Sequence, residues 1–293
     1  MKSNKHKWTD YFRDTTHATL DLGKLYLRWL PSDRKETVDK EYWAQSIISA
    51  VNLAPKPYFK FHFPKETFPS LILEEKIDFH KVYKKSDKFI TDTAKVLRKI
   101  HNLARKQKKT INKHIPEDKL LSGGAYDPLV ILNVFVLSPL EKLKKSKKNL
   151  VTKTVEKSLI EIEKRIAELD KKVAYKKEYC SLIHGDLNDT NIVRTKKGKI
   201  MLIDWADCRW DIVTCDLSQF IYLHFLTKRE QKLFLKTYDA SWVTEEMIEI
   251  HRLLLIGWDI IYLMTVDLNY ETDKADRLES LKRKVWVNNK IPI

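Results

Sequence analysis

Residues 181–193 read SLIHGDLNDTNIV, and residues 199–205 read KIMLIDW. Each stretch contains a short apolar run that stops at polar residues, the first at His184 and the second at Asp204. A hydrophobic strand that ends in this way presents polar side chains at one edge. The two stretches therefore raise the question of whether these polar groups perform chemistry or only terminate strands.

The segment that joins the two runs, NIVRTKKGKIMLID, has the pattern of a β-hairpin. The glycine of its KKG turn tolerates the positive φ that a tight hairpin turn requires. A two-residue turn there places Asn191 opposite Asp204 at the open end, and a longer or bulged loop shifts this register by about one residue. Asp186 lies in the turn that enters the same end. The sequence thus predicts that Asp186, Asn191 and Asp204 converge.

These three side chains suit phosphoryl transfer. The amide oxygen of Asn191 and the carboxylate of Asp204 are ligands of the kind that Mg²⁺ prefers. The carboxylate of Asp186 can accept the proton of a substrate hydroxyl, which orients the nucleophile. The alternative is that Asp and Asn merely cap turns, as they often do. Three such residues at one end of one hairpin are harder to explain by capping.

The same residues carry a resemblance to a known family. HGDLNDTN (184–191) and LIDW (202–205) match the pattern His-x-Asp-Leu, three variable residues, Asn, and then a strand ending in Ile-Asp; a further aspartate, Asp216, follows twelve residues after Asp204. This pattern resembles the catalytic segment of the aminoglycoside phosphotransferase and choline kinase superfamily, which is related to protein kinases. The resemblance implies an α+β fold with two lobes, and a phosphotransferase with an alcohol group as acceptor.

The resemblance also implies roles for the motif residues. Asp186 would be the catalytic base toward the substrate hydroxyl, and Asn191 and Asp204 would bind Mg²⁺. His184 would belong to the catalytic loop and support it from within, as a buried structural residue. Asp216 would anchor the loop through hydrogen bonds.

Upstream of the motif, the resemblance implies a nucleotide site. KLYLRWLPSD resembles the strand from which a cationic side chain, here Arg28, reaches the ATP phosphates. DKEYWAQSII resembles the helix that supplies its acidic partner, here Glu41, although a solvated carboxylate at a helix start is the alternative. SLILEEKID resembles the segment that joins the lobes, where backbone groups would meet adenine at Glu74, Glu75 and Lys76.

The expected cofactors are ATP and Mg²⁺. A glycine-rich phosphate loop is not visible, since TTHATLDLG contains a single glycine near its end. Members of the superfamily outside the protein kinases often lack that signature, so the expectation of activity stands. The choice between ATP and GTP stays open.

The resemblance and the hydrophobic patterns together predict two lobes. Residues 1–76 are expected to form a small, β-rich, nucleotide-binding lobe with one helix. Residues 77–293 are expected to form a larger, mainly helical lobe. The catalytic loop and the metal-binding hairpin (181–216) belong to that second lobe.

The acceptor is expected to be choline, ethanolamine or a related amino alcohol. Aromatic faces next to a carboxylate attract a desolvated ammonium group, and the order of LRWLP and DKE favours the choline kinase branch. Large aromatic residues at helical spacing also pack cores, which is the alternative for each of them. An aminoglycoside or a sugar is the other possible acceptor. The candidate substrate residues are Trp205, Asp207, Trp258, Asp259 and Tyr262.

The composition allows one different class of function. The 293-residue chain has a formal net charge of +15, which suits a nucleic-acid-binding or scaffold protein that retains a kinase-like fold without catalysis. However, the lysines are spread from end to end among acidic residues, as on solvated helix faces, so no nucleic-acid partner is expected. Three cysteines without a Cys-x-x-Cys pair favour a reducing, cytoplasmic location. No apolar stretch is long enough to span a membrane.

A protein kinase is a further alternative. The chain has no Ala-Pro-Glu segment, and only twelve residues separate Asp204 from Asp216, which leaves no room for an activation loop. The nucleotide and a small-molecule alcohol are therefore the expected partners.

Overall fold

The computed structural model describes residues 18–30, 35–63, 70–81, 85–115, 126–145 and 153–265. The chain divides into two compact units. Unit 1 comprises Met1–Pro116 and Ser181–Trp210, and unit 2 comprises Glu117–Cys180 and Asp211–Ile293. Unit 1 thus contains the predicted nucleotide-binding sheet together with the motif segment. The predicted α+β class is confirmed, whereas the lobe boundary near residue 76 stays a prediction.

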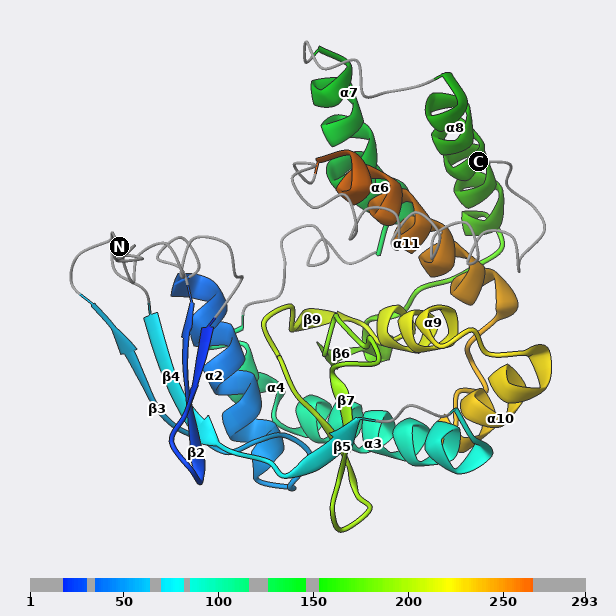
Figure 1. Cartoon of the computed structure of the whole chain (residues 1–293). Helices are drawn as coiled ribbons and strands as arrows, with labels where there is room; N and C mark the ends of the chain where they lie inside the picture. Colours follow the sequence, from blue (N-terminus) through cyan, green and yellow to red (C-terminus); the bar gives the residue numbers. More distant parts are fainter. Residues whose placement is uncertain are drawn as a thin grey trace, which may run out of the picture. The chain divides into compact units, whose positions relative to one another are not determined.

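An antiparallel sheet with the strand order β1-β2-β4-β3 forms the first part of unit 1. Helix α2 lies along one face of this sheet (Figure 1), where Val38 of the helix packs on Leu30 and Ile72 of the strands. Strand residues alternate between the two faces of a sheet, so Arg28 and Glu74 point to the same side as these apolar residues. The elements are β1 (Ala18–Asp21), β2 (Leu25–Leu30), α2 (Lys35–Ser49), β3 (Pro57–His62) and β4 (Ser70–Glu75).

The second part of unit 1 is built on helix α3. Its N-cap Ser86 accepts a hydrogen bond from the Phe89 amide, and its buried face includes His101. The Ser181 hydroxyl donates to the carbonyl of His101 at 2.8 Å, which fixes the strand before the motif to α3. The strands form the sheets β5-β7-β8 and β6-β9. The elements are β5 (Phe79–Lys81), α3 (Asp87–Lys106), α4 (Lys108–Ile111), β6 (Cys180–Ile183), β7 (Ile192–Thr195), β8 (Ile200–Leu202) and β9 (Arg209–Ile212).

Unit 2 is mainly helical in its described part. Helix α11 packs against α6, α8 and α9 around one apolar core. Gly257 of α11 allows a close approach to the π-helix η2, because a Cβ there would lie 3.2 Å from a Val136 methyl group. The elements are α6 (Pro128–Leu132), η2 (Asn133–Leu137), α7 (Ser138–Lys145), α8 (Lys153–Asp170), η3 (Lys177–Tyr179), α9 (Thr214–Leu223), α10 (Lys228–Tyr238) and α11 (Glu245–Thr265). None of the helices in the described ranges has the length and apolar character needed to cross a membrane.

Candidate active site

The hairpin of the motif has a three-residue loop. Ile192 pairs with Leu202, and the Thr195 amide donates to the Lys199 carbonyl at 2.8 Å. Gly198 closes this loop with φ +80°, as the last residue of a three-residue hairpin loop commonly does. The two-residue turn that was expected is therefore wrong, and every pair shifts by one residue.

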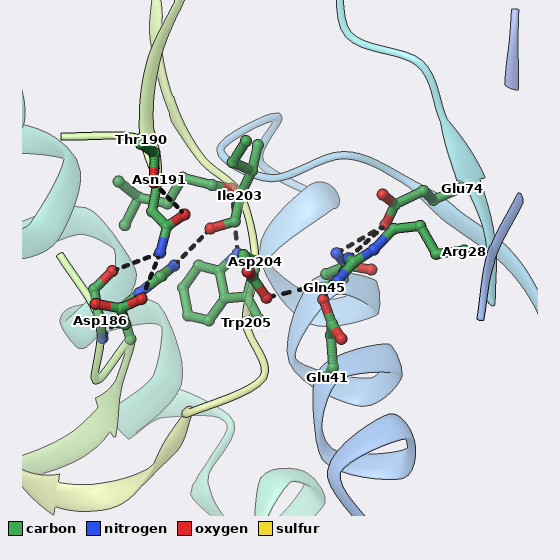
Figure 2. A network of polar contacts seen from close by, with 12 residues as sticks. Arg28, Glu41, Gln45, Glu74, Asp186, Thr190, Asn191, Ile203, Asp204 and Trp205 are labelled. Carbon is green, nitrogen blue, oxygen red and sulfur yellow. Dashed lines mark hydrogen bonds and ion pairs between the residues drawn. The ribbon is translucent and has the colours of Figure 1, made fainter. Parts of the chain in front are cut away.

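The shifted register changes the position of one predicted metal ligand. The Ile203 amide donates to the Asn191 carbonyl at 3.0 Å, so Ile203 is opposite Asn191 and Asp204 lies one residue beyond. Asp204 has φ +61°, an unusual left-handed conformation for a residue other than glycine. Its Oδ1 lies 3.5 Å from Nη2 of Arg28. The described contacts thus connect Asp204 to Arg28, not directly to Asn191 (Figure 2).

Asp186 and Asn191 are brought together as predicted. The Asn191 Nδ2 group donates to Oδ2 of Asp186 at 2.8 Å and to the Asp186 carbonyl at 3.0 Å. Figure 2 shows the amide nitrogen of Asn191 turned toward Asp186 and its oxygen turned away. Burial raises the pKa of the Asp186 carboxyl above its usual range, and the nearby carboxylates of Asp207 and Asp204 act in the same direction.

The side chains of His184 and Trp205 hold the motif segment in place through hydrogen bonds to its backbone. Both side chains are buried and their rings lie 4.6 Å apart. His184 bonds the Ile203 carbonyl through Nε2 and accepts the Asp186 amide through Nδ1. The Trp205 indole donates to the Leu202 carbonyl at 3.2 Å. His184 therefore has the structural position expected for it, whereas the burial of Trp205 favours a packing role over the predicted substrate contact.

Arg28 is the centre of a buried charge cluster in unit 1. Only 5% of this residue is exposed, and its Nη1 lies 2.5 Å from Oε1 of Glu41 and 3.5 Å from Oε2 of Glu74. Gln45, one turn after Glu41 on α2, donates to the same Glu74 oxygen at 3.0 Å. Glu41 is fully buried, so the alternative of a solvated helix-start carboxylate is wrong. Figure 2 shows the arginine between α2 and β4.

The cluster holds more negative than positive charge. Burial, together with the carboxylates of Asp204 and Glu74, raises the pKa of Glu41 to about 7, against the opposing effect of Arg28. Burial alone would lower the pKa of Arg28, but the three carboxylates around it outweigh this effect and raise that pKa. Arg28 therefore stays protonated, and a further cation or proton would relieve the excess negative charge.

Residues 74–76, which were expected to contact adenine, already make other contacts within unit 1. The side chain of Glu74 points into the charge cluster. The amide of Glu75 donates to the Lys56 carbonyl at 2.8 Å, and that of Lys76 donates to the Lys24 carbonyl at 3.0 Å. These two N–H groups are occupied, and the predicted contact of this segment with adenine stays a prediction.

The predicted metal ligands are oxygen donors. Among the described residues, no group of three or more His, Cys, Asp or Glu side chains is arranged to hold a metal ion. The predicted set is of another kind, with one amide oxygen and one carboxylate. From the described residues, Asn191 Oδ1 accepts a single hydrogen bond, from the Thr190 hydroxyl at 3.3 Å, and the Asp204 side chain is 30% exposed. Such donors fit a hard cation that keeps waters and phosphate oxygens as its other ligands.

The remaining substrate candidates lie in different places. Asp207 is exposed in unit 1. Trp258 and Tyr262 lie one turn apart on α11 of unit 2, with exposed fractions of 47% and 40%. Asp259 accepts a hydrogen bond from the Tyr222 hydroxyl at 3.4 Å. Their predicted contact with the acceptor stays a prediction.

The glycine of the motif should be sensitive to substitution. Gly185 has φ +85°, and a Cβ there would lie 2.4 Å from the Asp207 carbonyl oxygen, which is a backbone atom. We expect Gly185→Ala to lower the free energy of unfolding by about 1–3 kcal/mol, because strain and overlap add. Denaturant titration measures this. Gly198→Ala is the matched control, since it has a similar φ but open space around its Cβ; an equal loss in both variants would contradict the role of the overlap.

Comparison with known proteins identifies the family. The model of the phosphotransferase enzyme family matches residues 75–254, which is more than half of the chain. The chain belongs to this family. Membership confirms the predicted superfamily and supports the predicted class of enzyme, a phosphotransferase acting on hydroxyl groups. No curated protein sequence matches this phosphotransferase.

Solved structures similar to this phosphotransferase share its fold. The choline kinase LicA from Streptococcus pneumoniae has a TM-score of 0.60 at 16% identity, over 93% of this chain and 89% of the other. Spectinomycin phosphotransferase in complex with ADP and spectinomycin gives 0.65 at 13% identity, with coverages of 94% and 91%. The GDP complex of aminoglycoside 2'-phosphotransferase-IIIa gives 0.66 at 14% identity, with coverages of 93% and 90%. The predicted kinase-like fold is confirmed, and both candidate branches occur among these structures.

Sequence reasoning missed three participants in the site. Gln45 and the side chain of Glu74 belong to the Arg28 cluster, and Asn188 donates to the Asp186 carboxylate at 2.9 Å. The positions of Glu41 and Gln45, four residues apart on one helix, and the alternation of Ile72 with Glu74 along β4 were signals for the first two. For Asn188, the signal was a short amide side chain in a turn.

Proposed function

We propose that this phosphotransferase transfers the γ-phosphoryl group of ATP to the hydroxyl of an amino alcohol such as choline or ethanolamine. The observation that carries the proposal is the carboxylate of Asp186, which is held through Oδ2 by Asn191. Asn191 connects this base to the predicted metal position, because its amide nitrogen binds Asp186 while its oxygen is turned away from Asp186 and accepts a long, 3.3 Å hydrogen bond from the Thr190 hydroxyl.

In this proposal, Asp186 orients the substrate hydroxyl and accepts its proton. None of the described residues donates a hydrogen bond to its Oδ1, so this oxygen is open to a substrate. Arg28 places its positive charge beside the nucleotide phosphates, held there by Glu41 and Glu74. The residues thereby supply positioning and charge, on which catalysis of phosphoryl transfer mainly depends.

Mg²⁺ held by Asn191 and Asp204 would neutralise charge on the nucleotide phosphates. The proteins of similar fold that were solved with ADP or GDP support a nucleotide as the phosphoryl donor. ATP is the donor we propose, with GTP as the second to be tested. A cytoplasmic location is part of the same proposal.

The choice of an amino alcohol rests on aromatic side chains of unit 2. Phe135 lies edge-to-face with Trp258, with ring centroids 5.7 Å apart, and both are exposed along with Tyr262. Exposed aromatic faces can bind an ammonium group through cation–π attraction. The choline kinase among the similar structures supports this choice, and the spectinomycin phosphotransferase supports the aminoglycoside alternative. Family membership favours an enzyme over a nucleic-acid-binding scaffold.

The test is an ADP-release screen. The chain would be incubated with Mg·ATP or Mg·GTP and with choline, ethanolamine, spectinomycin or simple sugars. We expect the highest kcat/KM with choline or ethanolamine. Turnover of spectinomycin or a sugar alone would overturn the amino alcohol proposal, and turnover of none of them would overturn the proposed activity.

A variant of Asp204 tests the metal assignment. We expect Asp204→Ala to weaken Mg·ATP binding by at least about tenfold and to remove the dependence of ATP binding on Mg²⁺, because a charged oxygen ligand is lost. Calorimetric titration with and without Mg²⁺ measures both effects. Asp189→Ala, which removes an exposed carboxylate from the preceding loop, is the control. Unchanged magnesium dependence in Asp204→Ala would contradict the assignment.

A further inference from the structure

The proposed base, Asp186, is held by a second amide besides that of Asn191. The Asn188 Nδ2 group donates to Oδ2 of Asp186 at 2.9 Å, and this is the same oxygen that Asn191 binds at 2.8 Å. Two donors therefore meet on one oxygen of the carboxylate. Oδ1, the other oxygen, accepts no hydrogen bond from the part of the chain that the structure describes.

The orientation of the Asn188 amide is fixed by its other end. Its Oδ1 accepts hydrogen bonds from the Thr190 amide at 2.8 Å, the Thr190 hydroxyl at 2.5 Å and the Asn191 amide at 3.0 Å. A flipped amide would place its NH₂ group against two backbone N–H donors, which cannot accept a hydrogen bond. The loop thus dictates that the nitrogen of Asn188 faces Asp186.

A carboxylate without such contacts has little preference between its oxygens. The χ2 torsion of aspartate is broad and roughly two-fold, so either oxygen can take either position. Two amide donors on Oδ2 break this symmetry and keep Oδ1 in one place. General base catalysis requires the accepting oxygen within hydrogen-bond reach of the substrate proton, so this restriction matters for the reaction.

We propose that Asn188 is a positioning residue that fixes Oδ2 of Asp186 and so reserves Oδ1 for the substrate hydroxyl. This inference rests on the proposed function, in which Asp186 is the base. Asn188 differs from Asn191 in one respect: it holds the base without being a predicted metal ligand. Its loss should therefore affect the chemical step more than nucleotide binding.

Substitutions can test the donor Nδ2 of Asn188 separately from its acceptor Oδ1. Asn188→Asp keeps the oxygen that accepts the loop amides but places a second oxygen, without hydrogens, against Asp186. Asn188→Ser keeps a short acceptor for the loop amides and removes the Nδ2 donor without adding charge; the serine hydroxyl can still donate, but it sits one bond closer to the backbone than Nδ2. The double variant Asn188→Asp/Asp189→Asn removes the donor while keeping the net charge of the loop. Asp189→Asn alone is the control, because Asp189 is exposed.

Steady-state and single-turnover kinetics would be measured with Mg·ATP and the acceptor that the wild type phosphorylates, so that slow product release cannot hide the effect. We expect kcat and the single-turnover rate to fall about 10- to 100-fold in Asn188→Ser and in the double variant. KM for ATP should stay within about twofold, and Asp189→Asn should match the wild type. Rates within about threefold of the wild type in both variants that lack the Nδ2 group, or a loss that appears only in KM for ATP, would overturn the inference.

Failure of the proposed function gives a different result. A wild type that phosphorylates none of the tested acceptors overturns the function itself. A crystal structure of the full chain then decides whether the contact exists, and an Asn188 Nδ2 farther than about 3.5 Å from Asp186 Oδ2 overturns the inference. The same structure determined for Asn188→Ser shows whether Asp186 turns when the donor is lost, even if the variant has lowered stability.

Discussion

Asp186→Asn is expected to reduce kcat by about 10²- to 10⁴-fold, the usual contribution of a general base, while nucleotide binding is retained. The structure explains why an isosteric amide should fail. Asn188 and Asn191 both donate to one oxygen of Asp186, so the new amide would turn its oxygen toward these donors. Its NH₂ group would then face the substrate hydroxyl, and this group cannot accept the proton.

Two measurements check this prediction. ADP release gives kcat for the acceptor that the wild type phosphorylates, and a thermal-shift titration with Mg·ADP gives nucleotide binding. Asp189→Asn makes the same chemical change three residues later at an exposed position and should have normal kcat. If Asp186→Asn kept a kcat within tenfold of the wild type, the assignment of the base would be wrong. If it lost nucleotide binding as well, Asp186 would have a role in holding the nucleotide site.

The local part of the site was predictable from the sequence. The position of Asp186 next to Asn191 follows from five residues of one loop, and short spacing of this kind restricts geometry strongly. The hairpin register was not predictable, because KKG fits a two-residue turn and a three-residue loop equally well. Only the backbone shows that Gly198 closes the longer loop. The one-residue shift leaves Asp204 paired with Arg28.

The parts of the site that depend on contacts between distant residues were harder to predict from the sequence. Glu74 was expected to contribute its backbone to adenine binding, yet its side chain joins the Arg28 cluster, because Glu74 follows Ile72 on the face of β4 that α2 covers. Trp205 and Trp258 look alike in the sequence as aromatic residues beside aspartates. Long-range packing buries the first completely and leaves the second exposed. For the same reason, aromatic residues in the sequence cannot identify the acceptor.

Removal of the buried cation is the second large effect that we expect. Arg28→Met should lower the free energy of unfolding by about 3–5 kcal/mol at pH 8, because the carboxylates of Glu41, Glu74 and Asp204 would face one another without a positive charge. Methionine fills a comparable volume, so the loss would come from charge and not from a cavity. Urea denaturation measures the free energy, and KM for ATP should rise because Arg28 is the proposed phosphate contact.

The loss should depend on pH in a defined direction. Glu41 already has its pKa raised to about 7 by burial and the neighbouring carboxylates, and loss of Arg28 removes a positive charge that lowers this pKa. A carboxyl whose pKa is higher in the folded state stabilises the fold below its unfolded pKa, and this stability is lost as pH rises through the folded pKa. Arg28→Met should therefore be less destabilised at pH 6 than at pH 8, because protonation of Glu41 relieves the repulsion.

A double variant separates charge from packing. In Arg28→Met/Glu41→Gln, a neutral amide replaces one of the three carboxylates. This amide can donate to Oε1 of Gln45, which is buried in the wild type and has no hydrogen-bond partner among the described residues. The free energy of unfolding of the double variant should exceed that of Arg28→Met at pH 8, and its pH dependence between 6 and 8 should be weaker. If Arg28→Met lowered the free energy of unfolding by less than about 1 kcal/mol, or by the same amount at pH 6 and pH 8, Arg28 would not be needed to stabilise the buried carboxylates. The charge cluster would then not explain how this side chain is held for the nucleotide.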